Sequence, residues 1–439
     1  MTADKQPLPA VPSAPGAPSG ICREVYLDYA AATPMDPRVV AAMMPYLSER
    51  FENPSAPYAR ARVVRADFEA ARAELAHLMG GRPAQVTLTA GATEANNLAF
   101  AAVTGPVVTD AAEHESVLAC ARARGGTIVG VGPDGRVDAR AVAAAITPAT
   151  ELVSIELANG EVGAVQPVRE VARAVAAERS RRLDAGEKTP LLLHTDASQA
   201  AESLSVNVSS LGADLVTLSA AKVYGPKQVG LLWSSDRVTL RPLVLGGGQE
   251  GGVRSGTENV AGAVAFAEAL RIAVEGRAAE ARRLEALRER MRVRLAAEVP
   301  WMVVSGPLRA KLRLPGLLPV SFPGLDARRL VVLLERRGVS VGTGSACAAS
   351  RMESSHVLAA MGLSRKVAAG SLRISLGRPT TEDDVDYAAH AIVAVVRAEC
   401  GRLGLDPATG LTATGLTATG TPATGAQAPI STATEGGTR

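Results

Sequence analysis

The sequence has little of several features that would mark particular classes of protein. Only four of its 439 residues are cysteines, and no two of them form a C-x-x-C pair, which argues against a zinc site or a disulfide framework. Its apolar runs are short and broken by glycine, proline and charge, and residues 1–20 lack a continuous apolar core. We therefore expect neither a membrane span nor a signal peptide, and a cytoplasmic location.

The chain also has little excess of one charge over the other. The net charge is only +3, and the basic residues alternate with acids, as in RAAEARRLEALRERMRVR at 277–294. This pattern is typical of a solvated helix face, so we expect no nucleic-acid-binding surface. With 47% hydrophobic and 21% charged residues, the composition is that of an ordinary soluble protein, and the length allows one large core and one smaller core.

Composition divides the chain into four parts. The N-terminal residues are rich in proline, alanine, serine and glycine, and the C-terminal residues contain LTATG repeats that cannot bury apolar surface. We expect a disordered arm over 1–22, a large domain over 23–275, a small domain over 276–405 and a disordered tail over 406–439. The first residues after the arm are expected to pack with the small domain.

Hydrophobic periodicity predicts an α/β fold. Apolar runs that are typical of buried strands alternate with amphipathic helical stretches up to about residue 297, a pattern that favours a mainly parallel sheet with helices on both faces. Strands are predicted at 85–90, 151–157, 190–196, 214–219 and 229–233, and helices at 61–79, 93–102, 167–182 and 261–297. Beyond residue 300, strands at 318–322 and 371–376 and helices at 326–337 and 381–400 predict a smaller α+β domain.

An acid and a lysine follow two neighbouring predicted strands. Asp196 ends the run LLLHTD, and Lys222 follows the next strand on a loop with glycine and proline. Ligands of open α/β sheets bind at this edge. The pair fits a pyridoxal-phosphate site, in which the lysine amine bonds to the cofactor and the carboxylate keeps the pyridine nitrogen protonated. From these two residues alone, a helix-capping aspartate and a surface lysine are the favoured explanation.

Two glycine-containing segments are candidates for binding an anion. In TAGATEANNLAF at 89–100, a strand end is followed by a glycine and then by Thr93 at the start of a helix, where backbone N–H groups and the helix dipole favour phosphate. An ordinary capped helix has the same pattern. The stretch GGGQEGGVRSGTEN at 246–259 is a flexible loop that could bring Arg254 and Thr257 near an anion.

One cysteine has the setting of a reactive thiol. Cys347 lies in GTGSACAAS at 342–350, among small residues that predict an accessible loop rather than a packed core. The other three, Cys22, Cys120 and Cys400, lie at the arm junction and in helical stretches, so we interpret them as structural or incidental.

Taken together, these segments resemble the cysteine desulfurases of the class V aminotransferase superfamily. The resemblance runs from about Tyr26 to Gly404. Its motifs are YLDYAAATPMDPRV at 26–39, NPSAPY at 53–58, GATEANN at 91–97, EHESVL at 113–118, NGEVGAVQP at 159–167, HTDASQ at 194–199, SAAKVYGPK at 219–227, RSGTEN at 254–259, GSAC at 344–347 and SLRISLGR at 371–378. The resemblance implies the fold-type I architecture of pyridoxal enzymes, with a seven-stranded sheet, and a homodimer with its sites near the subunit interface.

The resemblance also implies a role for each matching residue. Lys222 would carry pyridoxal 5'-phosphate, His114 would stack on its ring and serve as the nearby proton carrier, and Cys347 would receive sulfur. The other implied cofactor contacts are Asp196 at the ring nitrogen, Gln199 at the phenolic oxygen, Ala92, Thr93 and Ser219 at the phosphate, and Thr257 at the phosphate of the partner subunit. Arg373 and Asn159 would bind the substrate. No resident metal is predicted, although Cys347 could transiently contact an iron–sulfur cluster.

Three positions depart from the family pattern. The family usually has histidine at the positions of Tyr58 and Ala221 and asparagine at that of Gly160, so polar contacts near the cofactor are lost. The cofactor affinity or the pH optimum could differ as a result.

The implied reaction converts L-cysteine to alanine and leaves a persulfide on Cys347 for an iron–sulfur scaffold or a thiolation pathway. A selenocysteine lyase, another class V aminotransferase and a non-catalytic sulfur-relay protein are the alternatives. The cysteine loop disfavours the first two, and intact Lys222, Asp196 and Arg373 disfavour the third.

Overall fold

The computed structural model describes residues 23–344 and 355–411. The predicted arm at 1–22, the segment that carries Cys347 and most of the predicted tail lie outside these residues.

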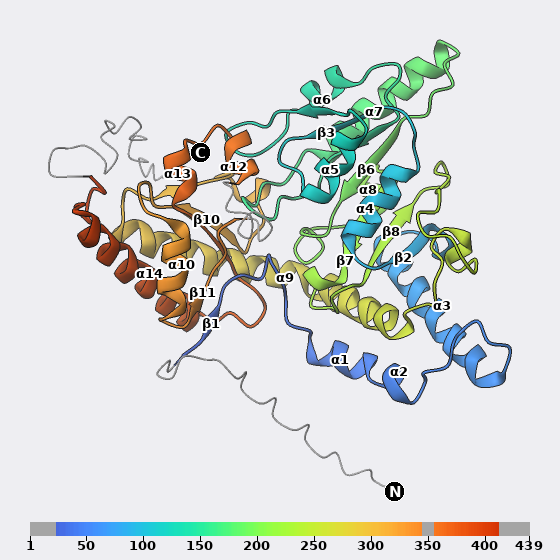
Figure 1. Ribbon diagram of the computed structural model, residues 1–439, viewed down its shortest axis with the longest axis horizontal. Helices are drawn as coiled ribbons and strands as arrows, with labels where there is room; N and C mark the ends of the chain where they lie inside the picture. Colours follow the sequence, from blue (N-terminus) through green and yellow to red (C-terminus); the bar gives the residue numbers. More distant parts are fainter. Residues whose placement is uncertain (1–22, 345–354, 412–439) are drawn as a thin grey trace, which may run out of the picture.

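A seven-stranded sheet forms the centre of the larger part of the molecule (Figure 1). The strand order is β2-β8-β7-β6-β5-β3-β4, and every neighbouring pair from β7 to β4 is parallel, whereas β8 runs antiparallel to both of its neighbours. The strands are β2 (Val86–Thr89), β3 (Val107–Asp110), β4 (Thr127–Val129), β5 (Leu152–Ser154), β6 (Leu192–Asp196), β7 (Leu215–Ser219) and β8 (Gly230–Ser234). The predicted mainly parallel sheet is therefore confirmed.

Helices cover both faces of this sheet, which explains why its strands are apolar on both sides. Val153, Leu193 and Val216 belong to a core with residues of α3 (Ala59–Met79), α7 (Val168–Asp184) and the first half of α9 (Val260–Glu298). Their strand neighbours Leu152, Leu192 and Leu215 pack on the other face against α4 (Ala92–Ala101) and α5 (Glu115–Ala123). Shorter helices are α1 (Pro37–Met43), α2 (Pro45–Ser48), α6 (Ala139–Ala145) and α8 (Val208–Leu211).

The remaining elements form a second core. Strands β9 (Val303–Val304), β10 (Leu317–Ser321) and β12 (Ser371–Ser375) make an antiparallel sheet in the order β12-β10-β9, and β1 (Val25–Tyr26) pairs in parallel with β11 (Val339–Ser340). The helices of this part are α10 (Ala327–Glu335), α12 (His356–Ala360), α13 (Arg365–Ala369) and α14 (Glu382–Leu403). Val25 and Leu27 are buried in the second core.

Helix α9 joins the two cores without a break (Figure 1). Phe266 and Leu270, near its start, are buried in the first core, and Met291 and Leu295, near its end, are buried in the second. The predicted boundary at 275/276 thus falls inside a continuous helix, and the division into two domains stays a prediction. In the described ranges, no helix combines the length and the apolar composition that a membrane span requires.

Candidate active site

The carboxyl ends of three parallel strands place several predicted site residues at one edge of the sheet. Asp196 is the last residue of β6, Ser219 is the last residue of β7, and Lys222 lies in the 3-10 turn η2 (Ala220–Lys222) that follows. His114 follows β3 and forms the N-cap of α5. Ligands bind at this edge in open α/β sheets, because the loops that leave the strands meet there.

Lys222 and Gln199 contact the same backbone carbonyl. The Lys222 Nζ donates to the carbonyl oxygens of Ala30 and Ala31 at 2.7 Å each, and the Gln199 Nε2 donates to that of Ala30 at 3.0 Å. The Oγ1 of Thr33 donates to the Ala221 carbonyl at 3.0 Å. The segment 30–33 therefore belongs to the site, although sequence analysis gave its residues no role, because its contribution is made largely through backbone atoms.

The start of α4 forms an open turn beside these residues. Gly91 is the N-cap, with a φ of 112°, and apart from its two chain neighbours no heavy atom of the described residues lies within 4 Å of the position that a Cβ would take. Ala92 and Thr93 form the first turn, where backbone N–H groups point out of the helix. A Cβ on Gly230 would lie 2.7 Å from the backbone of Gly91, so glycine at the start of β8 permits this close approach. The turn has the shape and polarity that suit a phosphate.

The glycine-rich loop at 246–259 contacts this turn differently from our expectation. The Arg254 Nε lies 3.0 Å from the Glu94 Oε1, so this arginine pairs with a carboxylate of α4. Thr257 is exposed. The contact between Thr257 and a partner subunit stays a prediction.

A hydrogen-bonded network connects Asp196 to His114. The Asp196 Oδ1 accepts from the Ser198 N–H at 2.9 Å, and its Oδ2 accepts from the Asn96 Nδ2 at 2.8 Å. The same Nδ2 lies 2.8 Å from the Ser116 Oγ, which lies 2.8 Å from the His114 Nδ1. Sequence analysis missed Asn96 and Ser116, although both lie in the motifs GATEANN and EHESVL.

Asp196 and Lys222 act electrostatically on His114. The His114 ring is accessible to solvent on one side and surrounded by protein on the others, and this desolvation lowers its pKa. The Asp196 carboxylate opposes the lowering, and the Lys222 ammonium adds to it. Three of the predicted site residues therefore lie close together.

Three buried acids lie close to one another near the loop that precedes His114. Asp110 and Glu113 are inaccessible to solvent, and Glu156 is 6% exposed. Burial raises the pKa of Asp110 to about 7 and the pKa values of Glu113 and Glu156 well above their usual range. Sequence analysis missed this group, because its members come from separate loops and strands.

Neighbouring residues of the chain satisfy the side-chain amide of Asn159. Its Nδ2 donates to the Ala112 carbonyl and the Glu156 Oε1, both at 2.9 Å, and its Oδ1 accepts from the N–H groups of Glu161 and Val162 at 2.8 Å. These four bonds use both donors and both lone pairs of the amide. The predicted substrate contact of Asn159 is therefore not part of the function proposed below.

Arg373 lies in β12, only 5% exposed, beside Gly342. Its Nη2 pairs with the Asp28 Oδ1 at 2.8 Å, and its Nη1 donates to the Gly160 carbonyl at 3.3 Å. Its backbone exchanges hydrogen bonds with Gly342. Within the described residues the Arg373 Nε is buried without a partner, which leaves a donor for an anionic ligand.

The departure at Gly160 has a structural counterpart. A Cβ at this position would lie 2.6 Å from the Gln199 side chain. The Gln199 side chain therefore occupies part of the space that the side chain of the usual asparagine would need. Glycine at position 160 allows this packing. Tyr58 is exposed at the N-cap of α3.

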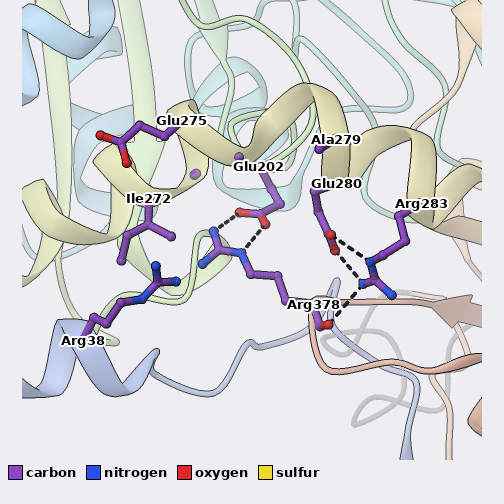
Figure 2. Close-up of a pocket in the computed structure, with 10 residues that line it drawn as sticks. Arg38, Glu202, Ile272, Glu275, Ala279, Glu280, Arg283 and Arg378 are labelled. Carbon is purple, nitrogen blue, oxygen red and sulfur yellow. Dashed lines mark hydrogen bonds and ion pairs between the residues drawn. The ribbon is translucent and has the colours of Figure 1, made fainter.

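One pocket is lined by none of the predicted site residues. It has a volume of about 490 Å³ and lies between α9 and the loops of Glu202 and Arg378 (Figure 2). Four of its charged residues pair with one another, because Arg378 forms two hydrogen bonds to Glu202 at 2.7 and 2.8 Å and Arg283 pairs with Glu280 at 2.7 Å. A smaller cavity of about 60 Å³ is lined by Gln199 and Lys222 among others.

Comparison with known proteins identifies the family. The family model Aminotransferase class-V matches residues 25–388. The chain belongs to the class-V aminotransferase family. Within that family it groups with the cysteine desulfurases, as the sequence motifs predicted.

Relatives and solved structures of this group match almost their full length. The cysteine desulfurase IscS of Anaeromyxobacter sp. (strain Fw109-5) is 41% identical over 85% of this chain and 92% of its own, and the cysteine desulfurase IscS 1 of Archaeoglobus fulgidus is 35% identical over 84% and 96%. A solved NifS-like protein is 33% identical with a TM-score of 0.77, covering 86% of this chain and all of its own. SspA in complex with cysteine is 31% identical with a TM-score of 0.68, covering 80% and 98%. The predicted fold-type I architecture is confirmed.

Proposed function

We propose that this chain is a cysteine desulfurase that uses pyridoxal 5'-phosphate to convert L-cysteine to alanine and to transfer the sulfur to Cys347. The observation that carries the proposal is the convergence of Asp196, Lys222 and His114 at one edge of the sheet, close enough for the first two to act on the pKa of the third. An acid, a lysine and a stacking ring are the groups that a pyridoxal site requires.

The residues present fit the cofactor. The open turn at Gly91 suits the phosphate, with Ala92, Thr93 and Ser219 around it, and Thr257 of a second subunit would complete this site. The Asp196 carboxylate accepts bonds from an amide and a backbone N–H, which position it and leave its negative charge for the ring nitrogen. When bound, pyridoxal phosphate supplies an electron sink for the α-carbon of an amino acid.

In the proposed mechanism, Lys222 removes the α-proton of the substrate and Arg373 holds its carboxylate. The fork of an arginine matches a carboxylate in geometry, and the buried Nε of Arg373 supplies a donor for it. The thiolate of Cys347 attacks the sulfur of L-cysteine, a sulfur–sulfur bond forms, the carbon–sulfur bond breaks, and the carbon skeleton leaves as alanine after it gains protons. Cys347 itself lies outside the described residues.

A homodimer and a sulfur acceptor complete the proposal. Large apolar side chains are exposed near α2, at Met44, Leu47 and Phe51, and in a second segment at Leu243 and Leu245, and a dimer interface would bury such groups. The acceptor would be an iron–sulfur scaffold or a thiolation protein. A cytoplasmic location stays a prediction.

Selenocysteine lyase and aminotransferase activities remain the alternative functions. Neither needs an enzyme thiol, so the test is whether Cys347 is required. A non-catalytic sulfur-relay protein would not need Lys222 and Asp196 at the sheet edge.

The experiment combines a Cys347→Ser variant with alanine and sulfide assays. The purified wild type should absorb in the violet and should release alanine from L-cysteine. Cys347→Ser should keep the absorption, because Lys222 and Asp196 are unchanged, and should release almost no alanine. Cys120→Ser is the matched control, because Cys120 is a partly exposed thiol on α5.

Mass spectrometry identifies the residue that carries the sulfur. After incubation with L-cysteine without reductant, the peptide with Cys347 should be heavier by one sulfur atom. Full alanine production by Cys347→Ser, or added sulfur on Cys120 or Cys400 instead, would contradict the mechanism and favour a lyase or an aminotransferase.

A further inference from the structure

Arg373 forms an ion pair with an acid to which sequence analysis gave no role. Its Nη2 lies 2.8 Å from the Asp28 Oδ1, and the side chains of Arg373 and Asp28 are 6% and 20% exposed. Water and salt screen such a partly buried pair only weakly, and a charge-assisted hydrogen bond is directional. The Asp28 carboxylate therefore restricts the orientation of the Arg373 guanidinium.

Main-chain bonds fix Asp28 beside Arg373. Asp28 forms a parallel β-bridge with Ser375, which lies two residues beyond Arg373 in β12. The Ser375 N–H donates to the Leu27 carbonyl at 2.8 Å, and the Ser375 Oγ accepts from the Ala30 N–H at 2.9 Å. Residues on both sides of Asp28 are therefore bonded to the strand that carries Arg373.

Glycine at position 342 leaves room for the ion pair. Gly342 forms a β-bridge with Arg373 from the other side. A Cβ on Gly342 would lie 2.7 Å from the Asp28 Oδ1, and 3.1 and 3.2 Å from the Nη2 and Nε of Arg373. The first distance is shorter than a carbon–oxygen contact allows, so a larger residue would displace the carboxylate or the guanidinium.

The ion pair leaves other donors of Arg373 for a ligand. Asp28 accepts at Nη2, and the Gly160 carbonyl accepts from Nη1 at 3.3 Å. The Nε has no partner among the described residues. Glu161 also acts on Arg373, but burial raises the pKa of this carboxyl, and no hydrogen bond joins it to Arg373 in the part of the chain that the structure describes. Asp28 thus orients the guanidinium without using all of its donors.

We propose that Asp28 is a positioning residue, which through its ion pair orients the guanidinium of Arg373 toward the carboxylate of an α-amino acid, and that Gly342 provides the space for this contact. The inference rests on the proposed function for the identity of the ligand. Asp28 acts through Arg373 and does not touch the substrate. Segment 28–31 then serves both cationic residues of the site, because its carbonyls also accept from Lys222.

Ligand titrations of the holoenzyme separate the orientation of Arg373 from a general loss of structure. L-alanine carries the α-carboxylate, whereas cysteamine has the amine and the thiol of L-cysteine without it. In Asp28→Ala the Kd for L-alanine should rise about 10-fold and that for cysteamine should stay within about twofold, because a misplaced guanidinium affects only the carboxylate. Asp28→Asn keeps an oxygen acceptor and should be intermediate. Equal rises for both ligands, or no rise for either, would overturn the proposal.

Steady-state kinetics give an independent measure. In Asp28→Ala the KM for L-cysteine should rise about 10-fold while kcat changes by less than about threefold, the pattern of a weakened binding contact. The matched control is Asp386→Ala, since Asp386 is a similarly exposed acid that pairs with Arg290 at 2.6 Å outside the site. A lower kcat at unchanged KM in Asp28→Ala would contradict the proposal. A wild type that makes no alanine would contradict the desulfurase function, and the titrations would still test Asp28.

A Gly342→Ala variant tests the geometry of the pair. Its Cβ should displace the ion pair and raise the Kd for L-alanine about as much as Asp28→Ala does, and the double variant should lose no more, because both changes act through one contact. Gly401→Ala is the control, since Gly401 is an exposed glycine of α14 whose Cβ would meet open space. Additive losses in the double variant would show that the two residues act separately.

Urea unfolding tests the ion pair without any ligand. Asp28→Ala and Arg373→Ala each leave one charge of the pair without its partner, so each should lower the unfolding midpoint. The double variant should lower it by less than the sum of the two shifts, because the second change removes the unpaired group. Shifts that simply add would overturn the proposal, and this result does not depend on the reaction that the protein catalyses.

Discussion

The middle of strand β6 at His194, called its inner end below, and its carboxyl end at Asp196, called its outer end, differ in how their polar groups are satisfied. His194 and Asp196 are two residues apart and therefore point to the same face of the sheet. His194 is fully buried, with its Nδ1 2.8 Å from the Ser154 Oγ and its Nε2 3.0 Å from the Thr217 Oγ1. Asp196 ends the strand, only partly buried, and its partners are neutral donors. At the inner end, neighbouring strands satisfy both ring nitrogens of His194. At the outer end, the Asp196 carboxylate lies where a ligand can contact it.

The two histidines of this region show the same contrast. Burial lowers the pKa of both, to about 4 for His194. Both nitrogens of His194 contact neighbouring strands, whereas His114 is hydrogen-bonded through its Nδ1 and is exposed. Changes at the outer end should therefore affect activity, and changes at the inner end should affect stability.

The largest expected effect is that of Lys222→Ala. The variant should lose the violet absorption, and alanine formation should fall by about three orders of magnitude or more, about 4 kcal/mol of barrier, because the covalent link and the base are both removed. Absorption spectra and an alanine assay measure this. The control is Lys227→Ala, since the exposed Lys227 also contacts segment 30–33 through the Thr33 carbonyl at 3.2 Å. Comparable losses in both variants would show that the effect is not specific to Lys222 and would contradict its assigned role.

A smaller loss is expected for Asp196→Asn. The variant keeps the size of the side chain and loses the charge that holds the ring nitrogen protonated, so kcat should fall by about two orders of magnitude, about 3 kcal/mol of barrier. Its free energy of unfolding should change little.

Asp214→Asn is the matched control for Asp196→Asn. Asp214 is buried before β7, where it pairs with Arg179 and accepts from the Leu193 N–H at 2.8 Å. This variant should lose stability and keep kcat at temperatures where it is folded. Steady-state kinetics and urea unfolding separate the two effects. A loss of kcat in Asp214→Asn together with a loss of stability in Asp196→Asn would contradict the comparison.

The inner end is tested by His194→Leu. The hydroxyls of Ser154 and Thr217 lose a buried partner, so the free energy of unfolding should fall by about 2 kcal/mol with kcat nearly unchanged. Chemical denaturation measures the first quantity and the alanine assay the second. A large loss of kcat in a folded variant would place His194 in the site.

The same variant should also change the pH dependence of stability, which is the smallest effect when counted per unit of pH. The folded pKa of His194, about 4, lies below the unfolded value of about 6.5, so the unfolded state binds the proton first as the pH falls. His194 therefore makes the wild type less stable as the pH drops from about 6.5 toward 4, by at most about 1.4 kcal/mol per unit. Asp110, with its raised pKa, acts in the opposite direction, so the difference between wild type and His194→Leu is the quantity to compare.

The strands that were predicted are those with long apolar runs. Strands β2, β5, β6, β7 and β8 lie within the predicted ranges or extend one residue beyond them. Strands β3 and β4 were missed, because β3 has four residues with only two apolar ones and β4 is an exposed three-residue strand at the sheet edge. Such short segments carry too little periodicity to be distinguished from loops.

The sequence by itself determined the sheet, the family and the candidate residues Asp196 and Lys222. These follow from local patterns, since a buried strand, a loop lysine and a motif are each contained within a few neighbouring residues. Tertiary structure alone decided how the candidates are held. Asn96 contacts Asp196 across 100 positions and the Ala30 carbonyl contacts Lys222 across 192, and no local pattern encodes such contacts. The buried amide of Asn96 likewise reaches the Ser116 hydroxyl only once α4 and α5 pack together on the sheet.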